Sequence, residues 1–290
     1  MIVDCFPFFA PTGVELLKLR VNLLKDVVDK FIIVESNKTH SGKPVERKFL
    51  EIARKQGLPM EKIHYVEHDI AEQEDLVIEK VDRINAGSNK GSEDSLYARV
   101  RERLQKDAVM QAMDHFNDDD VFIYGDADEI IKPNNVKWVA QMTRSHPEII
   151  LKIPLAYLQG RGDLRAYNLD GSPVVWWKAM FFATKKQIME TSVNRIRCGA
   201  VHWPIRWPTH KNKIIQDMGW HIAWMGGDET RKVKAESFAH AFDSFAWMPS
   251  VRGYGEYGKL DSSLMEEGPA PDGNVNHIVK RFPLDQLPSL

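Results

Sequence analysis

Two carboxylates separated by one residue, Asp126 and Asp128, follow the apolar run Val121–Tyr124 after a single glycine. Ligands of open α/β sheets bind at the carboxyl ends of strands, and the pair lies at such an end if the run forms a strand. Mg²⁺ or Mn²⁺ takes oxygen ligands and can bridge protein carboxylates to a diphosphate. The residues also fit a strand-end turn before a helix, whose dipole favours acids. Their place after the last of four alternating strands favours a metal site.

The segment from Asp217 to Glu229 is a second candidate, because it combines Trp, His, Gly and acids within thirteen residues. This mixture is more typical of a binding surface than of a core. The flat faces of Trp220 and Trp224 can stack on sugar rings while the sugar hydroxyls stay available for hydrogen bonds. His221 is a candidate third metal ligand, although a histidine between Trp and Ile is more often a buried structural residue.

Strands that alternate with helices must position both groups. Short apolar runs predict strands over residues 2–9, 31–35, 63–66 and 121–124. A Thr12-x-x-Glu15 capping box predicts that a helix begins there, and further helices are predicted over 45–56 and 96–116. The acids Asp118–Asp120 are interpreted as a solvated turn rather than as a metal cluster. The alternation indicates a mostly parallel sheet with helices on both faces.

The character of the chain changes beyond residue 150. Strands are predicted over 149–153 and 174–182, and seven of the eight tryptophans lie at or after Trp176. The sequence contains no internal repeat and no clear linker. We therefore expect a second lobe built onto the same sheet rather than an independent domain.

Composition excludes several classes of protein. The 290 residues are 43% hydrophobic and 28% charged, with a formal net charge of -2, which is typical of a globular chain and removes the electrostatic case for nucleic-acid binding. Only Cys5 and Cys198 are present, so no disulfide framework or thiolate metal site is expected. No apolar stretch reaches the length of a membrane span, and the N-terminus lacks the features of a signal peptide. We expect a cytoplasmic protein without a membrane span.

Several segments of the chain resemble glycosyltransferase family 17, the β-1,4-mannosyl-glycoprotein 4-β-N-acetylglucosaminyltransferases that add bisecting GlcNAc. The resemblance extends from about residue 2 to residue 240 and is carried by Val3–Phe9, Leu19–Leu23, Val27–Phe31, Ile33–Pro44, Arg101–Glu102 with Gln105, Asp126–Ile130 and Gly219–His221, with a weaker match at Lys234 and Ser237–His240. The most specific of these matches are Glu35–Gly42 and Gly219–His221, which are far more distinctive than Asp-x-Asp.

The resemblance implies a GT-A-like α/β fold, a divalent metal and a UDP-GlcNAc-like donor. It also implies inversion, in which an α-linked donor gives a β-linked product. Residues 1–150 would form the nucleotide-sugar-binding α/β half, and residues 151–290 an elaborated C-terminal acceptor lobe of the same catalytic domain. The chain departs from the family at Ala10–Thr12, where members usually have Asn-Glu, and at Lys106, where they usually have Arg. Animal members carry a membrane anchor that this sequence lacks, which favours a bacterial or viral relative with a cytoplasmic acceptor.

The resemblance also implies roles for individual residues. Asp126 and Asp128, with His221, would hold Mn²⁺ or Mg²⁺, which stabilises the leaving UDP. The donor-binding candidates are Glu35, Asn37, Thr39, His40, Arg101, Lys106, Lys234 and His240. For the last two the alternative is an ordinary solvated helix face. Inversion needs a carboxylate that takes the proton of the acceptor hydroxyl, and the unranked candidates are Asp217, Asp228 and Glu229. Trp220 and Trp224 would bind the glycan acceptor.

Two other functions remain open at this point. Phosphatases of the haloacid dehalogenase type also place Asp-x-Asp after a strand, but they need it near the N-terminus with Thr or Val after the second Asp, whereas Glu129 and Ile130 follow here. A carbohydrate-binding protein that uses the Trp-rich half without turnover is the non-enzymatic alternative. Turnover of UDP-sugars with Mn²⁺ would separate these classes. Acceptor pockets are built from variable loops, so the sequence leaves the acceptor and the oligomeric state open.

Overall fold

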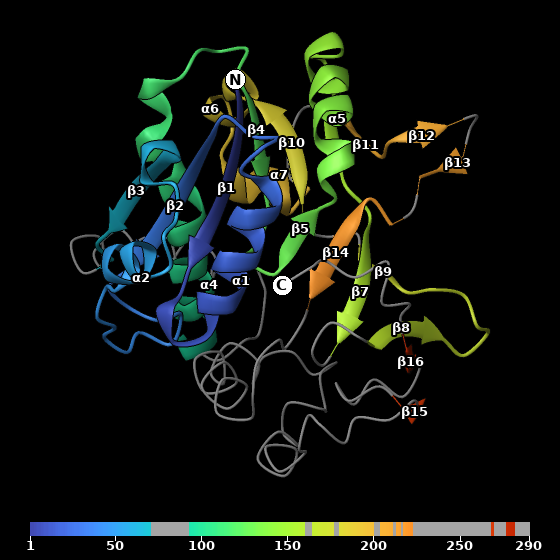
Figure 1. Cartoon of the computed structure of the whole chain (residues 1–290), viewed down its shortest axis with the longest axis horizontal. Coiled ribbons are helices and arrows are strands. Elements are labelled where there is room, and N and C mark those ends of the chain that lie inside the picture. Colours follow the sequence, from blue (N-terminus) through green and yellow to red (C-terminus); the bar gives the residue numbers. More distant parts are fainter. Residues whose placement is uncertain are drawn as a thin grey trace.

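The computed structural model describes residues 1–70, 93–159, 164–176, 180–199, 204–210, 213–215, 217–222, 268–269 and 277–281. Two larger sheets and one small hairpin make up the described strands (Figure 1). No helix in these ranges is both long enough and apolar enough to cross a bilayer.

The first sheet has the strand order β11-β6-β10-β4-β1-β2-β3. Its strands are β1 (Ile2–Phe8), β2 (Lys30–Ser36), β3 (Ile63–His68), β4 (Val121–Tyr124), β6 (Ile150–Lys152), β10 (Phe181–Thr184) and β11 (Ile205–Arg206). Neighbouring strands among β1 to β4 pair in parallel, and β11 pairs in parallel with β6. Only β10 runs against its neighbours β4 and β6. The carboxyl ends of β1, β2, β3 and β4 therefore meet at one edge of the sheet.

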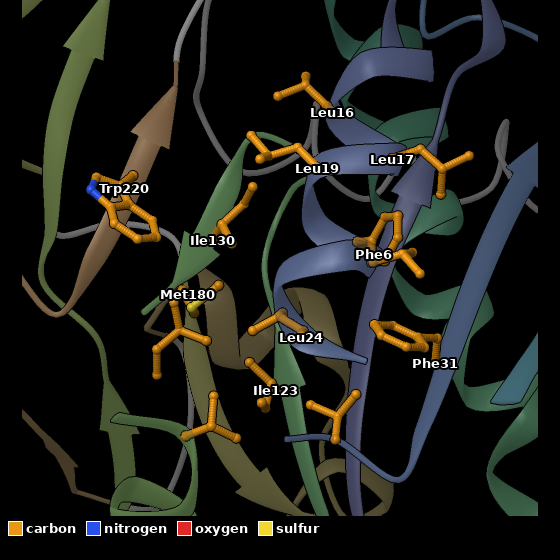
Figure 2. Close-up of a cluster of buried hydrophobic side chains, with 14 of the residues drawn as sticks. Phe6, Leu16, Leu17, Leu19, Leu24, Phe31, Ile123, Ile130, Met180 and Trp220 are labelled. Carbon is orange, nitrogen blue, oxygen red and sulfur yellow. The ribbon is translucent and has the colours of Figure 1, made fainter. Parts of the chain in front are cut away.

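Helices cover both faces of this sheet, with α1 in front of it and α4 behind it in Figure 1. The helical elements are α1 (Ala10–Leu24), α2 (Phe49–Lys55), α4 (Glu93–Asp107), α5 (Pro133–Ser145), α6 (Lys185–Met189), α7 (Val193–Arg197) and the 3₁₀ segments η1 (Met60–Lys62) and η3 (Ala108–His115). Burial on both faces explains the unbroken apolar strands. Phe6 and Phe31 pack in the core that α1 covers (Figure 2). Cys5 and Ile32 pack in the core beneath η3.

The second sheet lies beside the first and has the order β15-β16-β8-β7-β14-β5, with β9 on β7. Its strands are β5 (Glu129–Ile131), β7 (Leu155–Gln159), β8 (Leu164–Asn168), β9 (Val175–Trp176), β14 (Gly219–Ile222), β15 (Gly268–Pro269) and β16 (His277–Arg281); β12 (Thr209–His210) and β13 (Lys213–Ile214) form the hairpin. A Cβ on Gly219 would lie 2.3 Å from the Ile130 carbonyl oxygen, so only glycine lets β14 approach β5 this closely.

The chain passes from the first sheet to the second between β4 and β5, and again between β6 and β7. The first passage carries Asp126 and Asp128, so both carboxylates stand where the two sheets meet. Residues on both sides of position 150 contribute strands to both sheets, because β5 belongs to the second sheet and β10 to the first.

The predicted α/β class, a mostly parallel sheet with helices on both faces, is confirmed, as is the strand 121–124. The predicted solvated turn is confirmed for Asp118 and Asp119 but is wrong for Asp120, which is buried and pairs with the N-terminal ammonium group. The predicted helix start at Thr12 is wrong. Helix α1 begins at Ala10, directly after β1, with a proline in its first turn and no side-chain cap. Proline suits this position because its missing N–H has no partner in the first turn of a helix.

Three further boundaries differ from prediction. The single helix predicted over 96–116 is α4 followed by the 3₁₀ segment η3, and the helix predicted over 45–56 is the shorter α2. The single strand predicted over 174–182 is two strands, β9 and β10, which lie in different sheets. An apolar run does not show where the chain changes sheets, because both sheets bury such residues.

Candidate active site

A cavity of about 890 Å³, its open mouth included, lies at the carboxyl ends of the parallel strands. This is the position in which open α/β sheets bind ligands. The lining residues come from the end of β1 and the start of α1, from the loop after β2, from α4 and from the passage between the sheets: Pro7, Phe8, Phe9, Thr12, Gly13, Leu16, Lys38, Thr39, His40, Glu102, Gln105, Lys106, Asp126, Ala127 and Asp128.

The loop after β2 is a tight turn that brings Thr39 and His40 to the cavity. The Thr39 N–H donates to the Lys43 carbonyl over 2.8 Å, and the Gly42 N–H donates to the Thr39 carbonyl over 2.9 Å. The Thr39 hydroxyl oxygen accepts from the Lys43 N–H over 3.0 Å. This distinctive segment of the sequence therefore forms one wall of the cavity.

Helix α4 supports that turn from the side. Arg101 donates to the His40 carbonyl over 3.2 Å, and the His40 ring lies 2.8 Å from the Gln105 side-chain oxygen. Gly42 has a φ of +85°, and a Cβ there would lie 2.9 Å from the Arg101 guanidinium. Arg101, predicted to contact the donor, thus supports the turn instead of lining the cavity.

A buried ion pair between Arg20 and Asp4 supports the backbone of the Asp126 loop. Arg20 on α1 makes two bonds of 2.8 Å to Asp4 on β1, and both side chains are 0% exposed. Its remaining nitrogen, Nη1, donates to the backbone carbonyls of Asp126 and Glu129 over 2.6 and 2.9 Å. One guanidinium therefore fixes both the strand β1 and the loop that follows β4.

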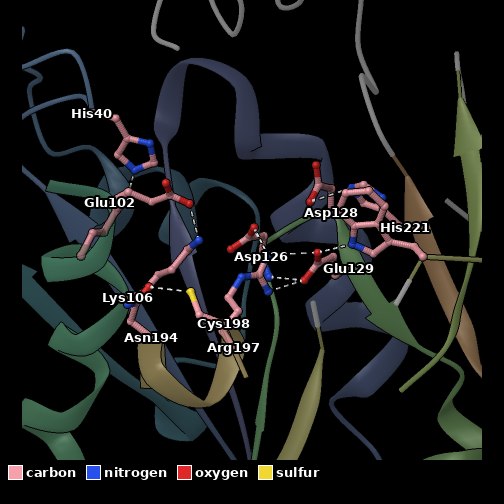
Figure 3. Close-up of polar contacts among 12 residues, drawn as sticks. His40, Glu102, Lys106, Asp126, Asp128, Glu129, Asn194, Arg197, Cys198 and His221 are labelled. Carbon is pink, nitrogen blue, oxygen red and sulfur yellow. Dashed lines mark hydrogen bonds and ion pairs between the residues drawn. The ribbon is translucent and has the colours of Figure 1, made fainter. Parts of the chain in front are cut away.

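Glu129 is saturated with hydrogen bonds (Figure 3). Its Oε1 accepts from Trp176 Nε1 over 2.8 Å and from Arg197 Nη2 over 3.2 Å. Its Oε2 accepts from the Asp126 N–H over 2.8 Å and from Arg197 Nη1 over 2.9 Å. Burial raises the pKa of Glu129, but the Arg197 guanidinium outweighs it and holds that pKa below its usual value. Glu129 is therefore an ionised structural anchor.

Asp126 shares the same cation. Arg197 Nη2 pairs with Asp126 Oδ2, while Asp126 Oδ1 is buried and has no hydrogen-bond partner among the described residues. Burial raises the pKa of Asp126 despite the attraction of Arg197. A buried carboxylate oxygen without a donor fits a site that completes its interactions with an ion or with water.

Arg197 is the residue that the sequence analysis missed. It ends α7, a five-residue helix that is fixed at two points. The Asn194 N–H donates to Asp107 over 2.7 Å, and Lys152 donates to the Arg197 carbonyl over 2.8 Å. Burial and the nearby Arg197 charge lower the pKa of Lys152 to about 8. No motif surrounds Arg197 in the sequence, so only the fold identifies it.

An ion pair within α4 faces the same cavity. Glu102 and Lys106 lie four residues apart, pair directly and both line the cavity. Burial raises the pKa of Glu102, but Lys106 outweighs it, so that the pKa is about 2. Lys106 is buried with its ammonium group turned toward the carboxylates (Figure 3). Lys106 therefore places a positive charge at the wall of the cavity.

His221 lies against the passage between the sheets. Its position in β14 pairs with Glu129 on one side and with Tyr157 on the other. Its Nε2 is 3.8 Å from Asp128 Oδ1, and its ring centroid is 4.3 Å from that of Trp176 and 5.2 Å from that of Tyr157. The fold thus brings together the three residues predicted to bind metal.

The residues fit a divalent ion that is only partly held by protein. Four carboxylates and two cations lie together here, with a formal charge of -2 (Figure 3). The carboxylates are Glu102, Asp126, Asp128 and Glu129, and the cations are Lys106 and Arg197; these six residues are called the acidic cluster below. Within the described ranges no three His, Cys, Asp or Glu side chains are spaced to hold a metal by themselves. The charge and the Asp126 oxygen suit a metal whose other ligands are diphosphate and water oxygens.

Glu35 and Asn37, predicted to contact the donor, are occupied elsewhere. Glu35 is 1% exposed and accepts from the N–H groups of Lys48 and Phe49, each over 3.0 Å, and from the Tyr65 hydroxyl over 2.7 Å. It therefore caps the start of α2. The Asn37 side chain binds Asp69 and the N–H of Ile70, and so secures the end of β3.

Trp220 and Asp217 also differ from prediction. Trp220 is 6% exposed and packs in the core that α1 covers, so it offers no face to an acceptor in this structure (Figure 2). Asp217 precedes β14, at the opposite end from His221, and accepts from Arg165 over 2.6 Å. A base in that position is remote from the cavity. The other candidates lie outside the described residues: Trp224, Asp228, Glu229, Lys234 and His240.

Comparison with known proteins gives one family and several distant structures. The family model "Glycosyltransferase family 17" matches residues 4–158. No curated protein matches the sequence. Glucosyl-3-phosphoglycerate synthase from Mycobacterium tuberculosis, in complex with phosphoglyceric acid, has 12% identity and a TM-score of 0.39, with 83% of this chain and 80% of that chain covered. S. aureus TarS 1-349 has 10% identity and a TM-score of 0.40, with 87% and 74% covered.

Proposed function

The chain belongs to glycosyltransferase family 17 and so transfers a sugar from a nucleotide-sugar donor, and we propose that it is an inverting enzyme that uses UDP-GlcNAc and Mn²⁺ or Mg²⁺. The acceptor in this proposal is a glycan. The choice of UDP-GlcNAc and of inversion rests on the sequence resemblance to transferases of bisecting GlcNAc, above all in the segments Glu35–Gly42 and Gly219–His221.

The acidic cluster, four members of which line the cavity, is the observation that carries the proposal. Asp126 and Asp128 line a cavity at the carboxyl ends of the parallel strands, where a nucleotide is expected. A diphosphate is repelled by a cluster whose formal charge is -2 unless further positive charge is supplied. A divalent ion supplies that charge and would stabilise the departing UDP as a Lewis acid. Asp126 and Asp128 would hold it, with His221 beside them.

Other residues of the cavity can orient the donor. Lys38 and Lys106 line it and carry the positive charge that a diphosphate needs. Thr39 and His40 come from the turn that α4 supports, so their positions are fixed before the donor binds. Preorganised groups of this kind lose little entropy on binding and so favour the correct donor geometry.

The base that inversion requires must approach the acceptor beside the donor's anomeric carbon. Asp228 and Glu229 remain candidates, because they follow His221 by only a few residues and β14 runs toward Asp128 in this direction. Asp217 is no longer a candidate, since it lies at the far end of that strand.

The proposal is tested by incubating the chain with UDP-GlcNAc, UDP-glucose and GDP-mannose, each with Mn²⁺ or EDTA, and measuring released nucleotide. We expect metal-dependent release of UDP, fastest from UDP-GlcNAc, and a product with inverted anomeric configuration by NMR. Faster release of GDP would refute the UDP-sugar assignment. Equal release of UDP in Mn²⁺ and in EDTA would refute the requirement for a divalent metal.

A further inference from the structure

We propose that Arg197 is a positioning residue that acts as a resident counter-ion: it occupies Asp126 in the free enzyme and so keeps the divalent ion from binding tightly before the donor arrives. This inference rests on the proposed function, since it concerns the same metal. In this proposal the ion enters and leaves together with the nucleotide.

The geometry of Arg197 supports the role. Its guanidinium spans two carboxylates, with Glu129 in a two-point contact at 2.9 and 3.2 Å and Asp126 paired through Nη2. The side chain is 10% exposed, so water screens the pairs weakly. A planar guanidinium held at two points by the buried Glu129 carboxylate is a fixed positive charge rather than a passing contact.

The two carboxylates are held differently. Both oxygens of Glu129 accept two hydrogen bonds each, so it has no remaining role as a ligand. Asp126 has one oxygen on Arg197 and one buried oxygen without a partner among the described residues. Glu129 thus anchors the guanidinium, and Asp126 is the member of the pair that an ion can compete for.

The backbone of Arg197 is fixed independently of these carboxylates. Lys152 donates to its carbonyl, and Asp107 binds the first turn of α7 through the Asn194 N–H. The charge therefore stays beside Asp126 when an ion binds. Cation affinity depends on how many unpaired charges surround a site, so a fixed positive charge there must lower it.

The test measures Mn²⁺ binding directly, by electron paramagnetic resonance of free Mn²⁺, in the absence and presence of UDP. We expect the unchanged chain to bind Mn²⁺ weakly alone and more tightly with UDP. Arg197→Gln takes the formal charge of the acidic cluster from -2 to -3 and should tighten binding of Mn²⁺ alone on the order of ten-fold or more. Arg197→Lys keeps the charge and should stay near the unchanged chain.

Two further variants separate charge from folding. Arg197→Gln with Glu129→Gln restores the charge of -2, and Mn²⁺ affinity should return toward that of the unchanged chain. Glu129→Gln alone gives -1 and should weaken Mn²⁺ binding by a similar factor, which keeps the test decisive if Arg197→Gln does not fold. Arg195→Gln, on the exposed side of the same helix, is the matched control and should change nothing.

The outcomes distinguish this inference from the proposed function. Two results would overturn the role of Arg197 even if the chain turns over UDP-GlcNAc with metal. One is tight binding of Mn²⁺ to the unchanged chain without UDP. The other is a Mn²⁺ affinity that does not change with the formal charge of the acidic cluster across the variants. Absence of both UDP-sugar turnover and UDP-dependent Mn²⁺ binding overturns the proposed function and this inference together.

Discussion

Arg20 Nη1 donates to the backbone carbonyl of Asp126 over 2.6 Å, although Arg20 itself does not line the cavity. The same guanidinium is paired with Asp4, and neither side chain is exposed. A residue 106 positions earlier in the chain therefore sets the backbone of the loop that carries the acidic pair.

Arg20→Met should destabilise the protein by about 3–5 kcal/mol, because it leaves Asp4 buried without a partner. Urea unfolding measures the loss. The double variant Asp4→Leu with Arg20→Met should cost less than the two single changes together, since it removes both charges. Arg54→Met, on the exposed side of α2, is the control. Additive losses in the double variant would contradict the pairing.

Asp128→Asn should lower kcat/KM by about 100-fold or more while stability changes little, because one charged oxygen ligand of the metal and donor is lost. Nucleotide release with UDP-GlcNAc and Mn²⁺ gives the rate, and thermal unfolding gives the stability. Asp118→Asn, in an exposed turn, controls for the loss of one carboxylate. Turnover close to that of the unchanged chain at saturating Mn²⁺ would remove Asp128 from the metal site.

His221→Ala should raise the Mn²⁺ concentration needed for half-maximal activity by about 10–100-fold, because His221 lies 3.8 Å from Asp128. A Mn²⁺ titration of activity and of direct binding measures the effect, with the exposed His146→Ala as control. A variant that unfolds readily but keeps its metal requirement would show that His221 only packs against Trp176 and Tyr157.

Gly42→Ala should cost about 1–2 kcal/mol of stability, because the residue has a φ of +85°. It should also raise KM for the donor, because the new Cβ meets the Arg101 guanidinium at 2.9 Å and displaces the turn that carries His40. Gly57→Ala is a matched control, with a φ of +63° but open space around the Cβ. Equal effects on KM in both variants would show that the contact with Arg101 is unimportant.

Trp220→Ala should destabilise the protein by about 3–5 kcal/mol, since the side chain is buried in the core, and Trp220→Phe should cost much less. Urea unfolding decides this. Trp138→Ala, 38% exposed on α5, is the control. A stable Trp220→Phe variant that has lost affinity for the acceptor alone would restore the role in acceptor binding.

The strands that build the cavity could be predicted because their residues are apolar without interruption. Phe31 and Ile32 are buried on opposite faces of the sheet, so both positions require apolar residues. The resulting unbroken apolar run is recognisable in the sequence as a buried strand. The location of Asp126 and Asp128 followed from the same reasoning, because the end of a buried strand is a defined edge. The local sequence pattern was therefore sufficient to predict those features of the fold that depend on residues close together in the sequence.

The partners of these carboxylates could not be predicted in the same way. Arg197 reaches Glu129 from 68 positions away, and a strand-end carboxylate such as Glu35 can cap a helix as well as bind a ligand. Trp220 was misassigned although a signal existed. Successive side chains of a strand face opposite sides, so Trp220 and His221 could not both face the same ligand.

Strand β5 begins directly after the Asp126 loop and lies at the edge of its sheet, where it pairs with β14. During synthesis at about 5–20 residues per second, the roughly 90 residues between Ile131 and Gly219 delay this pairing by about 5–20 s. The nascent chain therefore emerges with the Asp126 loop synthesised and the neighbouring edge strand β5 unpaired, which favours aggregation. Fragments that stop before β14 should be the insoluble ones, however complete their parallel sheet.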